Sequence, residues 1–473
     1  MILIAAVLWW GWRFVSNSGH DLAMKTLASQ HVSMGKEQSK NRESRLKPLI
    51  DLPSPSQTPA SATRISDLPF MGRCYSADPA VQEALGKDLE GLYELNKALL
   101  EARMPDRGTD FKKLALALGF PNAAQMSVVE AAAAFLKHME KFQNLLTAFK
   151  SDLAMGPWNW VGAGNFSNDF MVANSTMRML VNYSKPLSSL TEAALLTGDS
   201  TTAWGNLQVY RQMAERGAER GNVIGGIIGV SILRFQNNLL QRGIAQEQWS
   251  DGQLREAAEG KTAPSVLSIM RTSFAGEAAQ ISRNCQDRET LRNSIRENGT
   301  WLVRSGLFPI SDQQIDDSSA LIQADQAYYL AQFGEDGRFH PPPAGSRSPS
   351  SETMDKANFL ELAYFYPFSI GGDQAYQNLV NSAVEDQSTQ DMSRIEAGME
   401  IYRRQHGEYP PSLEELAPEF PGGVPVDPAT GQPYTYRPTA EGYTLLGTGR
   451  DQVLHEGNEA LNVVRHVKLP ENR

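Results

Sequence analysis

The sequence predicts a mainly α-helical protein with a small α+β module at its C-terminal end. Apolar residues recur at steps of three and four along most of residues 76–335, which is the period of amphipathic helices. Short glycine-containing turns separate these stretches, and strand-like alternation is confined to residues after 392. The expected fold is therefore a multi-helix domain followed by a module of different pattern.

The length of the chain indicates how many domains to expect, and its net charge limits the kinds of partner. A chain of 473 residues exceeds the roughly 250 to 300 residues at which a single core stops growing, so two or more domains are expected. Hydrophobic residues make up 41% and charged residues 21%, as in ordinary globular proteins. The formal net charge of −10 argues against nucleic acid as a partner, because contact with phosphates requires a basic surface.

Residues 1–15 form an apolar run that predicts a membrane signal-anchor. The run reads MILIAAVLWWGWRFV, and its tryptophans at the end nearest the rest of the chain fit an interfacial aromatic belt. A spanning helix needs about 20 apolar residues, so a cleaved signal peptide and a buried helix stay open as alternatives. The first basic residues follow the run, which by the charge-bias rule alone favours a cytoplasmic C-terminus. We nevertheless expect an inner-membrane protein with the bulk of its chain in the periplasm.

A polar linker at residues 16–75 precedes the helical domain of residues 76–335. Asp78 and Pro79 supply a cap and a first-turn proline, and the capping-box spacing of Ser127 and Glu130 predicts another helix start. No fixed repeat period emerges, so a solenoid-like arrangement stays open. Further amphipathic helices are predicted at residues 171–197, 202–216, 222–242, 264–281 and 314–333.

Three glycines, Gly221, Gly225 and Gly229, lie four residues apart in an apolar stretch. This spacing lets two helix backbones approach closely, in a membrane or in a soluble core. The apolar run around them is too short by our count to span a bilayer, so we expect close packing in a soluble core.

The C-terminal module occupies residues 392–473. A Pro- and Ser-rich linker at residues 336–353 and connecting helices at residues 354–391 lead to it. Within the module, an amphipathic helix from Met392 ends at Gly407, and a capping-box spacing at Ser412 predicts a short second helix. Strands are then predicted at residues 433–436 and 443–446, joined at Glu441 and Gly442.

The motifs of this module resemble the globular head of the type II secretion major pseudopilin. They are Gly407-Glu-Tyr409-Pro410, Asp427-Pro428 with Gly431-Gln-Pro433-Tyr434, and Gly442-Tyr443. The resemblance covers residues 392–451 and implies an extracytoplasmic location near envelope or secretion proteins. In a pseudopilin the hydrophobic assembly helix runs directly into the head, whereas the predicted anchor here lies far upstream. The role of a polymerising subunit is therefore not implied.

The same resemblance implies a calcium loop. In that family the loop after the last matched strand can bind calcium, and Asp451 falls where an acidic ligand would lie. Glu456, Asn458 and Glu459 are further oxygen donors nearby, of the type that calcium prefers. The alternative is an ordinary solvated acidic loop. No other cofactor is expected.

The rest of the sequence offers little chemistry. It contains no His-Glu-x-x-His, P-loop or Gly-x-Ser-x-Gly motif, so no catalytic residue can be named. His138 and His406 have structural explanations, and the adjacent Asp316 and Asp317 would face different directions on a helix. We expect the Trp158-Asn-Trp160 cluster to be buried rather than to form a binding surface.

The two cysteines, Cys74 and Cys285, leave two interpretations open. They could form one long-range disulfide in an oxidising compartment, or they could be independent buried thiols. A cysteine-rich framework and a four-cysteine metal site are both excluded by the count.

Two classes of function follow from these observations. The first is a membrane-anchored interaction or scaffold protein linked to type II secretion, which contacts the membrane through its N-terminal segment and envelope proteins through the rest. The alternative is an envelope hydrolase or polysaccharide-active enzyme that uses a cleft in the helical domain. We favour the first class, because only the size of the helical domain motivates the second.

Overall fold

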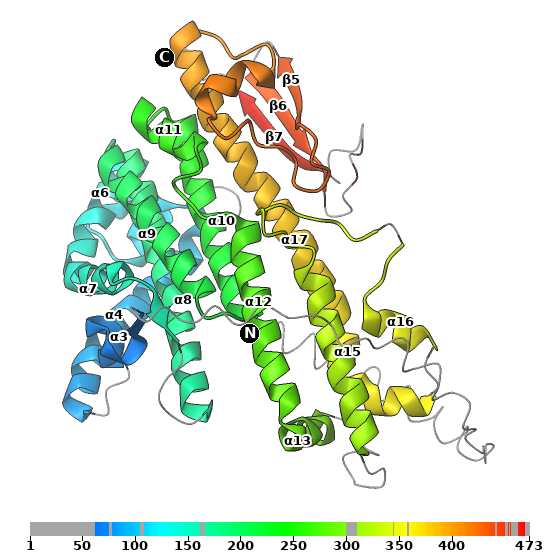
Figure 1. The fold of residues 1–473 in the computed structure, drawn as a ribbon. Helices are drawn as coiled ribbons and strands as arrows, with labels where there is room; N and C mark the ends of the chain where they lie inside the picture. The colour runs from blue at the N-terminus through cyan, green and yellow to red at the C-terminus, as the bar shows by residue number, and fades with distance from the viewer. Residues whose placement is uncertain are drawn as a thin grey trace. The chain divides into compact units, whose positions relative to one another are not determined.

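The computed structural model describes residues 62–74, 78–104, 108–160, 166–298, 310–343, 345–356, 359–439, 442–449, 453, 455 and 462–468. These residues are mainly helical and include a small three-stranded sheet, which confirms the predicted mainly α class (Figure 1). The chain divides into two compact units. The small unit is Met1–Leu52, Ile281–Tyr328 and Arg347–Gln377, and the main unit is Pro53–Gln280, Tyr329–Ser346 and Asn378–Arg473.

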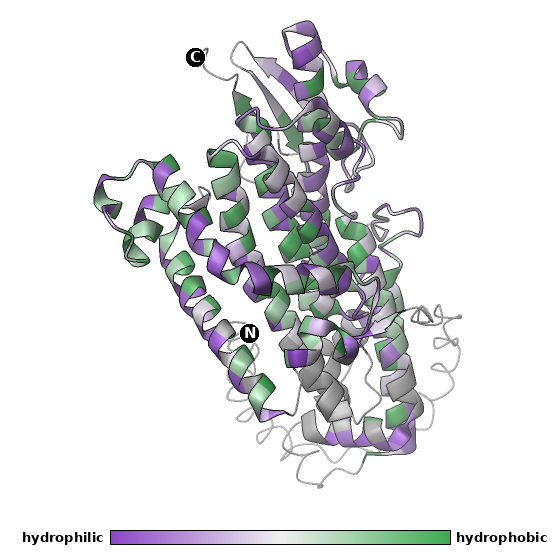
Figure 2. Cartoon of the chain, turned by 90° about the vertical axis from the view of Figure 1, so that its left-hand side faces the viewer, coloured by the Kyte–Doolittle hydropathy of each residue, from purple (hydrophilic) through white to green (hydrophobic). Residues whose placement is uncertain are grey.

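The main unit holds the helices between Pro53 and Gln280, including most of α12. Hydrophobic and hydrophilic residues are both present along most of its helices, as expected of amphipathic helices that pack on one face (Figure 2). Short 3₁₀ turns and two-residue strand pairs join them, with β1 (Thr63–Arg64) parallel to β4 (Trp158–Asn159) and β2 (Arg103–Met104) antiparallel to β3 (Gly108–Thr109). The helices are α3 (Pro69–Cys74), α4 (Pro79–Ala102), α5 (Phe111–Ala117), α6 (Val128–Met139), α7 (Gln143–Ala154), α8 (Phe166–Leu196), α9 (Ser200–Ala218), α10 (Val223–Ala245), α11 (Asp251–Ala258) and α12 (Val266–Gln286).

The helices predicted from apolar periodicity are confirmed, with shifts of a few residues at their ends. Predicted helix 202–216 is α9, predicted helix 222–242 is α10, and predicted helix 314–333 is α15 (Asp312–Leu330). α8 and α12 likewise cover the predictions at 171–197 and 264–281. The solenoid-like arrangement stays a prediction.

The predicted helix starts are also confirmed. The Asp78 carboxylate accepts a hydrogen bond from Ala80 N at 2.9 Å, with Pro79 at the first helical position. Ser127 Oγ accepts from Glu130 N at 3.1 Å, while the Glu130 carboxylate accepts from Ser127 N at 2.7 Å. This reciprocal pair is the capping box that the spacing predicts.

Glycines bring α9 and α10 into close contact. A Cβ atom on Gly225 would lie 2.5 Å from the carbonyl oxygen of Gly217, and one on Gly229 would lie 3.0 Å from that of Ala214. The predicted close approach of two backbones is therefore confirmed for these two positions. Gly221 differs, because it lies in the turn before α10 with a φ of 63°.

The expectation that the apolar run around these glycines is too short to span a membrane is wrong. α10 extends over 23 residues and is long and apolar enough to cross a bilayer by length and composition, unlike the other described helices. More than half of its most apolar stretch is buried within the structure, as in the core helix of a folded domain.

The helix α17 (Phe359–His406) has 48 residues, and its part from Asn378 onward belongs to the main unit. Residues 354–391 were predicted as connecting helices. Their described parts, 354–356 and 359–391, fall in α16 (Pro349–Lys356) and α17, and α17 continues without a break past Met392. Met392, Ile395 and Met399 are buried, as the predicted apolar face requires. Gly407, with a φ of 82°, ends the helix in the left-handed conformation that glycine adopts without strain.

A three-stranded antiparallel sheet packs beside this part of α17 (Figure 1). Its order is β5 (Thr435–Thr439), β6 (Gly442–Gly447) and β7 (Val463–Lys468), with Thr435 opposite Leu446 and Tyr443 opposite Val467. The predicted hairpin is thereby confirmed, although its first strand begins two residues later than predicted. The third strand was not foreseen.

The short helix predicted after Ser412 is a 3₁₀ helix, η4 (Leu413–Glu419). Ser412 precedes it but makes no side-chain capping bond to its backbone, so the capping-box prediction is wrong at this position. Pro418 lies inside the segment and has no N–H group for a longer hydrogen-bonded helix. A tight 3₁₀ turn tolerates this loss better than an α-helix would.

The small unit has its own apolar cluster and surface ion pairs. Leu291 of α13 (Arg288–Asn298) and Ile315 of α15 are buried against each other. Asp316 pairs with Arg288 at 2.7 Å, whereas Asp317 accepts a hydrogen bond from Gln313 at 2.9 Å. The two adjacent aspartates therefore serve different partners, as their spacing on a helix predicts.

Candidate functional site

The second half of α17 lies along α10 and is tied to it by polar side chains. Asn237 donates from Nδ2 to the carbonyl oxygen of Thr389 at 3.3 Å, and Gln241 donates from Nε2 to Ser393 Oγ at 2.5 Å. Arg234, two turns before Gln241, holds Asp386 through two bonds of 2.6 Å. These contacts recur along successive turns of both helices, so they align α17 with α10 over most of their shared length.

A second group of contacts ties the end of α17 to the loop before α11 and to the first residue of α11. Arg403 pairs with Glu247 at 2.5 Å, and Arg404 pairs with Asp251 at 3.0 Å. Both arginines also bond Glu400 at 2.8 Å, and Glu400 is 3% exposed. The buried carboxylate thus orients two guanidinium groups toward the neighbouring helix.

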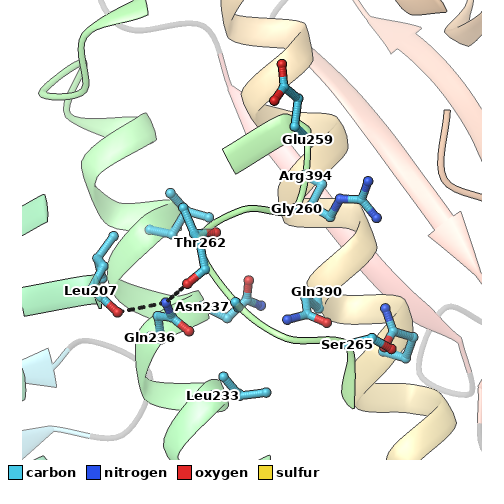
Figure 3. A pocket seen from close by; sticks show the side chains of 13 residues that line it. Leu207, Leu233, Gln236, Asn237, Glu259, Gly260, Thr262, Ser265, Gln390 and Arg394 are labelled. Carbon is cyan, nitrogen blue, oxygen red and sulfur yellow. Dashed lines mark hydrogen bonds between the residues drawn. The ribbon is translucent and has the colours of Figure 1, made fainter. Parts of the chain in front are cut away.

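A pocket of about 160 Å³ opens between α10, the segment that joins α11 to α12, and α17 (Figure 3). Leucines from α9 and α10 and side-chain amides from α10 and α17 line it. The segment between α11 and α12 crosses it at Gly260 and Thr262. All of these residues belong to the main unit.

Gln236 is the most deeply placed polar residue of the pocket wall, with 3% of its surface exposed. Its Nε2 donates to the carbonyl oxygens of Leu207 at 2.9 Å and Thr262 at 2.6 Å, as the dashed lines of Figure 3 show. Its Oε1 is buried and has no hydrogen-bond partner among the described residues. A buried acceptor without a donor costs about 1–3 kcal/mol, so this atom is the outstanding polar feature of the pocket.

The α17 side of the pocket is a connected network. Gln387 Oε1 accepts from Ser265 Oγ at 2.8 Å, and Gln387 Nε2 donates to Asp391 at 3.0 Å. Arg394 donates from Nη1 to Asp391 at 3.1 Å and from Nε to the carbonyl oxygen of Ala258 at 3.1 Å. Asp391 therefore positions two of the side chains, Gln387 and Arg394, by which α17 holds the segment between α11 and α12.

Burial raises the pKa of Asp391 to about 6, against the lowering effects of Arg394 and Gln387. The nearby Asp427 carboxylate raises it further. Asp427 itself is buried and accepts from Ala429 N at 2.9 Å and Thr448 N at 2.7 Å. This bonding explains the Asp427-Pro428 motif structurally, because the side chain ties the 427–431 turn to the end of β6.

The residues predicted as a calcium loop, Asp451, Glu456 and Asn458, lie outside the described residues, as does Glu459. The calcium loop therefore stays a prediction. Within the described ranges no group of three or more His, Cys, Asp or Glu side chains is placed to hold a metal ion.

The tryptophan cluster is buried, as predicted. Trp158 is 1% exposed and donates from Nε1 to the carbonyl oxygen of Asp152 at 3.0 Å. Trp160 is 7% exposed and donates to that of Arg216 at 3.1 Å. Both indoles therefore anchor backbone segments rather than forming a binding surface.

The histidines also have structural surroundings. His138 is half-buried between Phe120 and Phe142, and burial lowers its pKa. His406 stacks on Tyr402 with ring centroids 4.0 Å apart, in the last turn of α17. The aromatic contacts of both rings fit the structural explanations that the sequence suggested.

Burial raises the pKa of the Cys74 thiol to about 11, and its Sγ donates to the carbonyl oxygen of Phe70 at 3.6 Å. A thiol in this state is a weak nucleophile. The side chain of Cys285 lies outside the description, so its pairing with Cys74 stays one of the two predicted alternatives.

None of the pocket residues was predicted from the sequence. The glutamines and asparagines of α10 and α17 carry no motif, and only the packing of the two helices brings them together. A weak signal exists in Gln236, a polar residue at a core position of an apolar helix. Comparisons with protein-family models, with curated proteins and with solved structures give no match for this chain.

Proposed function

We propose that this chain is a membrane-anchored extracytoplasmic interaction protein that holds a pseudopilin-like head in a fixed orientation for an envelope partner. The anchor is the apolar segment at residues 1–15, and the partner is a component of type II secretion or of its surroundings. The observation that carries the proposal is the set of polar contacts between α17 and the helices α10 and α11. A head on a free linker would have no need of them.

The ion pairs fix the orientation of α17 on its neighbours more than they stabilise the fold. Arg234 is 54% exposed while its partner Asp386 is 14% exposed, so solvent screens the pair in part. Such pairs contribute about 0–1 kcal/mol each, much less than a buried apolar side chain. The two-point geometry of Arg234 with Asp386 and the repetition of polar contacts along α17 instead select one register between the helices.

The course of α17 into the C-terminal module favours a head that is presented to a partner. The long helix α17 runs directly into the module and packs against an antiparallel sheet, with Tyr434 Oη donating to the carbonyl oxygen of Ser388 at 3.4 Å. The assembly helix of a pseudopilin enters its head in the same way. Here the helix comes from within the chain, which favours a presented head over a polymerising subunit.

The alternative, an envelope hydrolase, has no observation in its favour among the described residues. Glycoside hydrolysis by the usual routes needs two carboxyl groups flanking the bond. The pocket wall contributes one carboxylate, Glu259, and this group pairs with Lys261. An interaction role is therefore preferred.

Co-purification from gently solubilised envelopes tests the proposal. We expect the full chain to recover a stoichiometric partner, and Asp386→Arg to lose it because two arginines would then face each other across α10 and α17. The double variant Arg234→Asp/Asp386→Arg restores opposite charges and should recover the partner. Absence of any stoichiometric partner, or equal recovery by all three proteins, would overturn the proposal.

The location is tested separately. A tag added after Arg473 should be digested by protease in spheroplasts whose inner membrane is intact. Digestion only after lysis of that membrane would place the module in the cytoplasm and contradict the extracytoplasmic part of the proposal.

A further inference from the structure

We propose that a small hollow between the end of α4, the β2–β3 pair and α8 binds a chloride ion. The proposal is independent of the interaction role above. Residues of these four elements line the hollow, and all of them belong to the main unit. The proposal rests on the charges of the wall, on a pair of hydroxyl groups in it and on its size.

Two cations without a described counter-ion line the hollow. Arg103 and Lys185 both belong to its wall, and among the described residues neither has an acidic side chain at ion-pair distance. The carboxylate of the wall, Glu192, is 8% exposed, and both of its oxygens are engaged. One accepts from Thr109 N at 2.7 Å and the other pairs with Arg242 at 3.0 Å. Positive charge is therefore in excess, and an anion is the ligand that balances it.

Arg103 is held in place by aromatic packing. Its guanidinium carbon lies 4.6 Å from the centroid of the Phe235 ring on α10. The ring attracts the face of the cation and leaves the N–H groups at its edge able to donate. Pairing of β2 with β3, in which Arg103 lies opposite Thr109, also fixes its backbone. Little side-chain freedom is thus left to lose when an ion binds.

A hydroxyl pair in the wall supplies a further donor. Thr109 Oγ1 and Ser189 Oγ lie 2.8 Å apart and share one hydrogen bond. Two hydroxyl groups have two hydrogens, so this bond uses one hydrogen and leaves the other. Among the described residues no second acceptor bonds either hydroxyl group. An anion can accept the remaining hydrogen, whereas a cation cannot.

The size of the hollow selects a very small anion. It measures about 20 Å³, and a site for one water molecule needs about 10–15 Å³. A chloride ion is slightly larger than a water molecule and fits this volume, whereas tetrahedral oxyanions such as phosphate are too large. In so small a space a single ion lies against both cationic side chains.

Chloride NMR measures the binding directly, because an ion held by a protein relaxes fast and broadens the signal of the ions that exchange with it. The full chain should broaden the chloride line, and Lys185→Gln should lose most of this broadening. Lys97→Gln is the matched control. Lys97 is exposed on α4 outside the hollow, so its replacement should leave the broadening unchanged.

The unfolding temperature gives a second measurement on the same proteins. Sodium chloride should raise that of the full chain by about 2 °C over sodium gluconate at equal ionic strength, because gluconate cannot enter the hollow and both salts screen charge equally. Lys185→Gln and Arg103→Gln should show no difference between the salts. Line broadening or a salt difference that survives in Lys185→Gln would overturn the proposal. Equal unfolding temperatures of the native chain in the two salts would also overturn it and assign the hollow to water.

Discussion

Arg234 and Asp386 lie 152 positions apart in the sequence and meet in a two-point ion pair, with both N···O distances at 2.6 Å. One residue comes from the helical domain and the other from the helix that leads into the C-terminal module. The pair therefore joins α10 of the helical domain to α17. Its contribution to the packing of these two helices can be measured directly.

A double-mutant cycle on this pair should give a coupling free energy of about 0.5–1 kcal/mol, since partial burial of Asp386 strengthens an otherwise exposed pair. The measurement is denaturant unfolding of Arg234→Ala, Asp386→Ala and the double variant, at low and high salt. The matched control is Lys87 with Glu83, 3.0 Å apart and 74% exposed on both sides, for which coupling close to zero is expected. Equal coupling in the two pairs would contradict the prediction.

Gly225→Ala should destabilise the protein by about 1–3 kcal/mol, because the added methyl group would lie 2.5 Å from the backbone oxygen of Gly217 and force α9 and α10 apart. Gly205→Ala is the control. Gly205 lies on the exposed face of α9 with nothing within 4 Å of a built Cβ atom, so alanine there should stabilise by about 0.5–1 kcal/mol. Chemical denaturation of both variants checks the opposite signs.

Asp391 should make stability fall as pH rises from about 4 to about 6. Because burial raises its pKa, the folded state binds the proton more tightly than the unfolded state in this window. The rise from 3.8 to about 6 corresponds to about 3 kcal/mol, at about 1.4 kcal/mol for each tenfold change in proton affinity.

Unfolding free energies of the native chain and of Asp391→Asn, measured across this pH range, test the assignment. The variant should lack this part of the slope, because asparagine does not titrate. Parallel curves for the two proteins would show that Asp391 is not the group responsible.

Asp427→Ala should cost about 2–4 kcal/mol, because it leaves the N–H groups of Ala429 and Thr448 without the acceptor that both now share. Glu408→Ala, at an exposed position after α17, should change stability by less than about 0.5 kcal/mol. The unfolding midpoints of the two variants measure these two stability changes. A cost for Asp427→Ala no greater than that of the control would refute the bracing role of its carboxylate.

Calcium is tested by chelation. If the loop at Asp451, Glu456 and Asn458 holds calcium, removal of the metal should lower the unfolding temperature of the native chain and leave that of Asp451→Asn unchanged. An unfolding temperature that does not respond to chelation would assign an ordinary acidic loop.

The local structure was largely determined by the sequence itself. Helical periodicity, the capping pairs at Asp78 and Ser127 and the turn glycines act within one or a few turns, so their consequences could be predicted without knowing the fold. The prediction failed after Ser412, where the same capping spacing precedes a 3₁₀ helix. There a proline within the segment outweighed the local signal.

Only the tertiary structure decided the pocket and the docking of α17. In the sequence, Gln236 is one polar residue on an apolar helix, and only the fold shows that its amide donates to Leu207 and Thr262. Asp386 is likewise an ordinary helical carboxylate in the sequence, and only the fold pairs it with Arg234. Partners so far apart in sequence leave no periodic pattern, because their meeting depends on how whole helices pack. The sequence therefore determined which segments are helices and strands, and the packing of those helices determined which side chains face one another.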